Sequence, residues 1–253
     1  MTIVLVHGNP ETEAIWDDLK PLLTSEVVAL SPPGFGAPMP PGFEATSDAY
    51  LAWLCDEVAK IPGPVDLVGH DWGGGHVARL ASIHPDLIRS WACDIGGCFD
   101  PEYVWHDAAQ VWQTPDAGEQ AVAGMTATPQ EARAAQFESL GMSKAIAGKV
   151  AGAVNEEMGR SILALYRSAA QPAMSQWGEQ FNAASARPGL MIIPTEDHYT
   201  GGEAMARRTA ERVGAKVAVL QGLGHWWMCQ DPKAGAAVLN QFIDDVNKTP
   251  ARV

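Results

Sequence analysis

Short apolar runs recur along this chain, separated by stretches in which apolar residues are three or four positions apart. The runs are rich in Val, Ile and Leu and end at Gly or are followed within two residues by Gly or Pro, which is typical of strands buried on both faces. Six runs are expected to be strands: 3–6, 27–30, 65–69, 88–95, 189–193 and 216–220. The intervening helical spacing is clearest at 14–23, 49–60 and 232–246. Strands alternating with helices predict an α/β fold with a mostly parallel sheet.

The pattern changes between residues 99 and 186, where helical segments follow one another without a convincing strand. Three helices are expected there: 103–111 capped by Asp100, 129–140 beginning at Pro129, and 155–170 beginning at Asn155. We therefore expect a core domain made of 1–98 and 187–253, interrupted by a helical domain over 99–186.

Composition narrows the class of partner. The formal net charge of −13 disfavours nucleic acid and anionic membranes. The four cysteines show no C-x-x-C spacing, which favours reduced thiols and a cytoplasmic location. The chain opens without a basic segment typical of signal peptides, and no apolar run is long enough to cross a membrane. The sequence leaves monomer and homodimer open.

The strand expected at 65–69 runs directly into Gly69-His70-Asp71-Trp72-Gly73 and then a helix. Glycines on both sides of the central residue permit a sharp turn, and the turn holds Asp71 at the positive end of the helix. A carboxylate in that place is already a nucleophile and needs no base to remove a proton. The alternative interpretation is a glycine-rich turn with a helix-capping aspartate.

Polar groups also follow three other expected strands. His7-Gly8-Asn9-Pro10 follows the first, Asp197 comes soon after the fifth, and His225 soon after the sixth. Taken singly, these are an ordinary turn, a loop carboxylate and a loop histidine. Because the carboxyl ends of parallel strands meet at one edge of a sheet, we expect Asp71, Asp197 and His225 to lie together.

These motifs resemble the α/β-hydrolase family over nearly the whole chain. The G-x-D-x-G turn resembles the family's nucleophile elbow with aspartate in place of serine, and H-G-x-P resembles its oxyanion loop. The order Asp71, Asp197, His225 is the family's order of nucleophile, acid and histidine. The resemblance implies an oxyanion hole made by the backbone N–H groups of Asn9 and Trp72, and a helical cap over 99–186. It also implies that the sheet lacks the family's two leading strands.

With an aspartate in the nucleophile position, the sequence resembles the branch of the family that contains haloalkane dehalogenases, fluoroacetate dehalogenases and epoxide hydrolases. The implied reaction has two steps: Asp71 displaces a leaving group from carbon, and His225, oriented by Asp197, activates water to hydrolyse the ester. The resemblance implies a small, largely apolar substrate and water. It implies no metal or organic cofactor, and no cluster of metal ligands with suitable spacing is visible.

Two points remain open at this stage. Asp94, at the end of the fourth strand, is a rival to Asp197 for the acid, and Glu196 is a third candidate; the loop Pro194–Asp197 resembles the family more closely. The identity of the leaving group is the second open point.

The indole of Trp72 and the amide of Asn9 resemble the halide-binding pair of haloalkane dehalogenases. Tyr166 resembles one of the two cap tyrosines of epoxide hydrolases, but Trp112 stands in the place of the other, with Tyr103 a possible substitute acid. Both cap residues would equally suit simple packing. Hydrolytic dehalogenation is therefore expected, with epoxide hydrolysis as the alternative and a non-catalytic ligand-binding protein as a third hypothesis.

Overall fold

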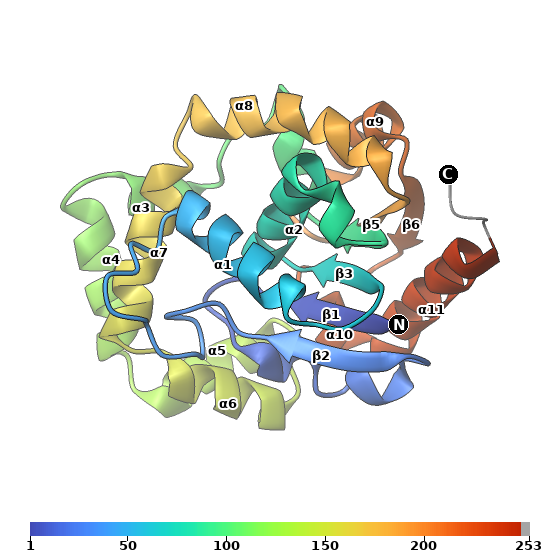
Figure 1. The fold of residues 1–253 in the computed structure, drawn as a ribbon. Coiled ribbons are helices and arrows are strands. Elements are labelled where there is room, and N and C mark those ends of the chain that lie inside the picture. The colour runs from blue at the N-terminus through green and yellow to red at the C-terminus, as the bar shows by residue number, and fades with distance from the viewer. Residues whose placement is uncertain (249–253) are drawn as a thin grey trace.

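The computed structural model describes residues 1–248, which form a six-stranded parallel sheet with helices on both faces (Figure 1). The strands lie in the order β2-β1-β3-β4-β5-β6. Their bounds are β1 Thr2–Val6, β2 Glu26–Leu30, β3 Val65–Gly69, β4 Ser90–Cys93, β5 Gly189–Pro194 and β6 Lys216–Leu220. The predicted α/β fold with a mostly parallel sheet is confirmed.

Alternate residues of β1 belong to two separate hydrophobic clusters, because successive side chains of a strand point to opposite faces of the sheet. Val4 and Val6 pack with α1 (Ser47–Ala59), α2 (Trp72–Ile83) and α9 (Gly202–Val213) on one face. Ile3 and Leu5 pack with α11 and the segment around Trp16 on the other. All five residues of β1 are buried, which explains why its sequence is apolar without alternation.

The helices between β4 and β5 account for the region where the sequence pattern changes. The α-helices among residues 1–248 are α1 Ser47–Ala59, α2 Trp72–Ile83, α3 Asp107–Gln113, α4 Ala117–Ala127, α5 Gln130–Ser139, α6 Lys144–Ala153, α7 Glu156–Ser168, α8 Ala173–Gln180, α9 Gly202–Val213, α10 Trp227–Gln230 and α11 Pro232–Lys248. Helices α3, α4 and α7 lie beyond the carboxyl ends of β1, β2 and β3, toward which the arrowheads point (Figure 1). No helix among residues 1–248 combines the length and apolar character needed to cross a bilayer.

Two expected helices are wrong. Residues 14–23 form two short 3-10 helices, Glu13–Trp16 and Lys20–Leu22, because Pro21 has no N–H with which to continue an α-helix. The helix expected at 103–111 begins instead at Asp107, where the His106 side chain accepts from the N–H of Ala109. Asp100 caps no α-helix there, since its carboxylate accepts from the N–H of Glu102 and binds Arg208.

Strand register brings the polar loops together. Val6 pairs with Gly69, and Gly69 pairs with Cys93, so the residues that follow β1, β3 and β4 leave the sheet at the same level. Pro194 pairs with Leu220 at the ends of β5 and β6. The loop 7–10, the turn 69–73, Asp94, Asp197 and His225 therefore share one edge.

Candidate active site

The turn 69–73 is held by close backbone packing. A Cβ on Gly73 would lie 2.2 Å from the carbonyl oxygen of Val6, and one on Gly69 would lie 2.4 Å from the carbonyl oxygen of Gly73. Asp71 between them has φ 50° and ψ −128°, a conformation that L-residues rarely adopt. Its side chain makes no capping hydrogen bond to α2, so helix capping does not explain this aspartate.

The two oxygens of the Asp71 carboxylate have different surroundings. Oδ1 accepts from the backbone N–H of Asn9 at 2.9 Å and contacts the Asn9 amide nitrogen at 3.4 Å. Oδ2 lies 3.6 Å from Nε2 of His225. Burial, only partly offset by attraction to His225, raises the pKa of Asp71 to about 6.

His225 is paired with Asp197. Its Nδ1 lies 2.8 Å from Asp197 Oδ2, and Asp197 Oδ1 accepts from the N–H of Tyr199 at 2.9 Å. Burial disfavours the imidazolium, but the Asp197 carboxylate outweighs burial and raises the pKa of His225. Burial likewise acts against the Asp197 charge, but the attraction of His225 keeps the pKa of Asp197 below its ordinary value.

The rival carboxylates lie elsewhere. Asp94 Oδ2 is 2.5 Å from Nδ1 of His70 and accepts from the indole N–H of Trp227 at 2.7 Å. Asp94 Oδ1 accepts from the backbone N–H of Asp71 at 3.1 Å. Glu196 is exposed. Of the three candidates, the structure places Asp197 beside His225.

Glu11 belongs to the site but was not expected from the sequence. It is fully buried, and its Oε2 accepts from the N–H of Gly8 at 3.1 Å. Its Oε1 lies 3.1 Å from Nε2 of His70 and accepts from the indole of Trp226. Its position directly after the loop 7–10 is the only sequence signal that could have drawn attention to it.

Glu11, His70 and His225 also form the one group of potential metal ligands found among the described residues. Their ligand atoms lie within 4.8 Å of one another. Both ring nitrogens of His70 already face carboxylates, so this group is an ion-pair network in the present structure.

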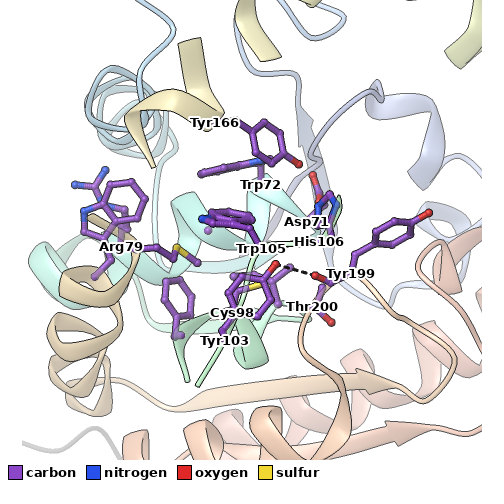
Figure 2. A pocket seen from close by; sticks show the side chains of 15 residues that line it. Asp71, Trp72, Arg79, Cys98, Tyr103, Trp105, His106, Tyr166, Tyr199 and Thr200 are labelled. Carbon is purple, nitrogen blue, oxygen red and sulfur yellow. Dashed lines mark hydrogen bonds between the residues drawn. The ribbon is translucent and has the colours of Figure 1, made fainter. Parts of the chain in front are cut away.

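Two unequal cavities adjoin Asp71. The larger, of about 500 Å³, is lined by Asn9, His225 and Trp112 among others. The smaller, of about 30 Å³, is walled by aromatic side chains, and Figure 2 shows the indoles of Trp72 and Trp105 stacked beside Asp71. Their ring centroids are 5.9 Å apart.

Tyr166 lines both cavities and contacts the predicted halide donors. Its hydroxyl lies 3.5 Å from the amide nitrogen of Asn9, and its ring meets Trp72 edge-on at 5.3 Å. Burial and the nearby Asp71 carboxylate raise the pKa of Tyr166, although hydrogen bonds with the side chains of Asn9 and Trp72 act against this. Trp112 packs on Tyr166 at 4.8 Å. Tyr103 lines only the smaller cavity, and its hydroxyl already donates to the carbonyl of Tyr199.

The model of the alpha/beta hydrolase family matches residues 3–238, which include every residue of this site. The chain belongs to the alpha/beta hydrolase family. Solved structures similar to this hydrolase over 99% of its chain include a haloalkane dehalogenase from Bradyrhizobium elkanii, with a TM-score of 0.76, 18% identity and 91% of that chain covered. Another is the wild-type protein DBJA, with a TM-score of 0.78, 18% identity and 93% of that chain covered. At these identities the likeness concerns the fold.

Curated relatives of this hydrolase match over shorter stretches. A pimeloyl-[acyl-carrier protein] methyl ester esterase from Neisseria meningitidis is 38% identical over 35% of this chain and 28% of its own length. Bifunctional epoxide hydrolase 2 of Rattus norvegicus is 33% identical over 36% of this chain and 17% of its own length. The Bacillus subtilis AB hydrolase superfamily protein YfhM is 20% identical over 95% of this chain and 88% of its own length. The matched stretch thus spans about a third or less of the first two relatives.

Proposed function

We propose that this hydrolase cleaves the carbon–halogen bond of a small, largely apolar organic compound through an ester formed on Asp71. The placement of the Asp71 carboxylate carries the proposal. One oxygen is held by the loop 7–10, while the other faces His225 at 3.6 Å, beside two cavities. A carboxylate so placed suits displacement at a saturated carbon, because it is nucleophilic without prior deprotonation.

In the first step, Oδ2 of Asp71 attacks the halogenated carbon, a carbon–oxygen bond forms, and the halogen leaves with the bonding electrons. The departing halide needs hydrogen-bond donors, because its charge is otherwise buried without compensation. The amide of Asn9 and the indole of Trp72, which both contact the Tyr166 hydroxyl, supply N–H donors beside the reacting carbon.

In the second step, His225 takes a proton from water, and the resulting hydroxide attacks the carboxyl carbon of Asp71. Negative charge develops on Oδ1, which the backbone N–H of Asn9 already contacts at 2.9 Å. Collapse of this intermediate expels the alkoxide, which takes the proton from His225, and leaves Asp71 as the carboxylic acid. Loss of that proton to solvent returns the carboxylate. The balance is halide, alcohol and one proton from substrate and water.

Charge couples the two steps. The ionised Asp71 raises the pKa of His225. Esterification removes that charge, so the pKa of His225 falls, which favours the neutral imidazole when a base is required. The same coupling holds whichever leaving group Asp71 displaces.

We further propose that residues 99–186 act as a cap that selects the substrate. Trp105, Trp112 and Tyr166, which line the cavities beside Asp71, come from this region. All four cysteines are free thiols, and three of them are buried, which supports the proposal of a reducing, cytoplasmic environment.

Epoxide hydrolysis is the second candidate, and the Tyr166 hydroxyl favours it. This buried phenol lies beside the nucleophile and retains its proton, so it could donate to an epoxide oxygen. Trp112 is not an acid and Tyr103 already donates to a carbonyl, but Tyr199 is a second phenol that lines both cavities. A non-catalytic ligand-binding protein would not require the assembled Asp71, Asp197 and His225.

A parallel screen of haloalkanes, haloacids and epoxides tests the reaction, with halide and diol measured separately. Halide release is the expected result. Diol formation from epoxides, with no halide from any halogenated compound, would establish the second candidate instead.

Mass spectrometry of the peptide containing Asp71 tests the ester. His225→Gln should accumulate a substrate-derived mass increment on that peptide, and Asp71→Asn should show neither increment nor turnover. The hydrolysis rate of the trapped ester should fall further in Asp197→Asn than in Asp94→Asn, since only Asp197 contacts His225. A fully active Asp71→Asn protein would refute the covalent mechanism.

A further inference from the structure

Glu11, His70 and Asp94 form a buried array behind His225 that the proposed reaction does not use. The three side chains are at most 2% exposed. Nδ1 of His70 lies 2.5 Å from Asp94 Oδ2, and Nε2 lies 3.1 Å from Glu11 Oε1. A buried ionisable array of this kind is costly unless its charges are paired.

The hydrogen-bond pattern determines the protonation of His70. Glu11 is otherwise surrounded by N–H donors, from Gly8 and Trp226. Asp94 is likewise surrounded by N–H donors, from Asp71 and Trp227. Such surroundings stabilise ionised carboxylates, which can only accept. Both ring nitrogens of His70 must therefore donate, so the ring is an imidazolium.

The two ends of the array hold the backbone of the reacting groups. Glu11 accepts from the N–H of Gly8, the residue before Asn9, while Asp94 accepts from the N–H of Asp71 itself. His70 thus joins the loop 7–10 to the turn 69–73. We propose that His70 is a positioning residue: held as a cation between Glu11 and Asp94, it fixes Asn9 against Asp71 and sets the charge beneath His225.

The location of the cation gives it an electrostatic role as well. The His70 and His225 rings are 4.5 Å apart between centroids. The charge of His70 acts to lower the pKa of both His225 and Asp71. The other ionisable groups that interact with His70 are Glu11, Asp94, Asp197 and His7. Burial lowers the pKa of His7 to about 4, so His7 is neutral. The cation thus favours a neutral base and an ionised nucleophile together.

Nitrogen-15 NMR of the histidine rings tests the proposal without a substrate. In the wild-type protein, both ring nitrogens of His70 should show protonated shifts at about pH 7.5, one unit above the ordinary pKa of histidine. In His70→Gln, the titration of His225 should move to higher pH by about one unit or more, as expected when a neighbouring like charge is removed. His76→Gln is the matched control, because His76 is another fully buried histidine, whose pKa burial lowers to about 3.

The kinetic counterpart separates a positioning role from a merely structural one. As the pH is lowered, hydrolysis of the ester on Asp71 should begin to slow at a higher pH in His70→Gln than in the wild type. His76→Gln should show no such shift of the pH profile. A neutral His70 in the wild-type spectrum would overturn the proposal, even if His70→Gln fails to fold. An unchanged His225 titration in a folded His70→Gln would also overturn it.

This inference rests on the proposed roles of Asp71 and His225, but the NMR result distinguishes the two failures. If the spectra behave as expected and Asp71→Asn remains active, the proposed function fails while the charged array stands. If Asp71→Asn is inactive and His70 is neutral, the proposed function stands and the present inference fails.

Discussion

Replacing Asp71 by asparagine should stabilise the protein while abolishing the proposed chemistry. Burial raises the pKa of Asp71 from 3.8 to about 6, so the folded state holds this proton more tightly than the unfolded state. A difference of about two units between the pKa values of the folded and unfolded states corresponds to about 3 kcal/mol in the free energy of unfolding. Because 16% of the side chain remains exposed, this figure is an upper limit for the increase in the free energy of unfolding.

The stability gained by Asp71→Asn depends on pH. Above about pH 6, Asp71 is charged in both states and the folded protein bears the full cost. As pH falls from about 6 to about 4, the folded state takes up its proton first and the cost disappears. Asp71→Asn should therefore exceed the wild type by about 2–3 kcal/mol at about pH 7.5, with the advantage shrinking toward pH 4.

Urea unfolding at several pH values, followed by tryptophan fluorescence, measures this difference. Asparagine keeps an oxygen to accept from the N–H of Asn9, so the local geometry is preserved. Asp197→Asn supplies a control of opposite sign: His225 keeps the pKa of Asp197 low, so loss of that charge should destabilise the protein at neutral pH. Equal stabilities of Asp71→Asn and wild type at about pH 7.5 would refute the reasoning.

Three further predictions concern the pH dependence of the reaction and the stability of the fold. Ester formation, followed in single turnovers, should decline below about pH 6 as Asp71 takes up its proton, and a rate independent of pH between about 5 and 7 would contradict this. Gly73→Ala should lower the free energy of unfolding by about 3 kcal/mol or more, since its Cβ would meet a carbonyl of β1 at 2.2 Å, whereas Gly124→Ala, with nothing within 4 Å in α4, should stabilise by about 0.5–1 kcal/mol. Arg133→Met should destabilise by about 2 kcal/mol or more in thermal unfolding, because its guanidinium donates to carbonyls at the ends of α4 and α6. The exposed, weakly paired Arg160 is the control, and Arg160→Met should change stability by less than about 0.5 kcal/mol.

Features governed by local sequence could be predicted. Each strand is a short apolar run ended by a turn residue, and the turn 69–73 needs glycines that a reader of the sequence can see. Placing Asp71, Asp197 and His225 at one edge followed from the parallel sheet alone. The choice between Asp94 and Asp197 was harder, because both follow a strand and only the arrangement of the folded chain shows which histidine each one faces.

Features governed by distant partners were missed. Asp100 was interpreted as a helix cap because the local sequence does not show its partner, Arg208, which is on a helix far along the chain. Glu11 was not singled out, since nothing local indicates that His70 and Trp226 surround it. Trp105 carried no motif, yet it stacks on Trp72 and lines the smaller cavity.

The unequal cavities beside Asp71 have a consequence for chirality. Under the proposed attack, the leaving group of a substrate must face Asn9 and Trp72, which leaves two directions for the substituents of a secondary carbon. The cavity of about 30 Å³ offers much less room than the one of about 500 Å³, so we expect the smaller substituent in the first and the larger in the second. With its halogen on the donors, one enantiomer should fit the two cavities better than the other. In-line displacement would invert that carbon, so a racemic halide would yield predominantly one mirror-image form of the alcohol.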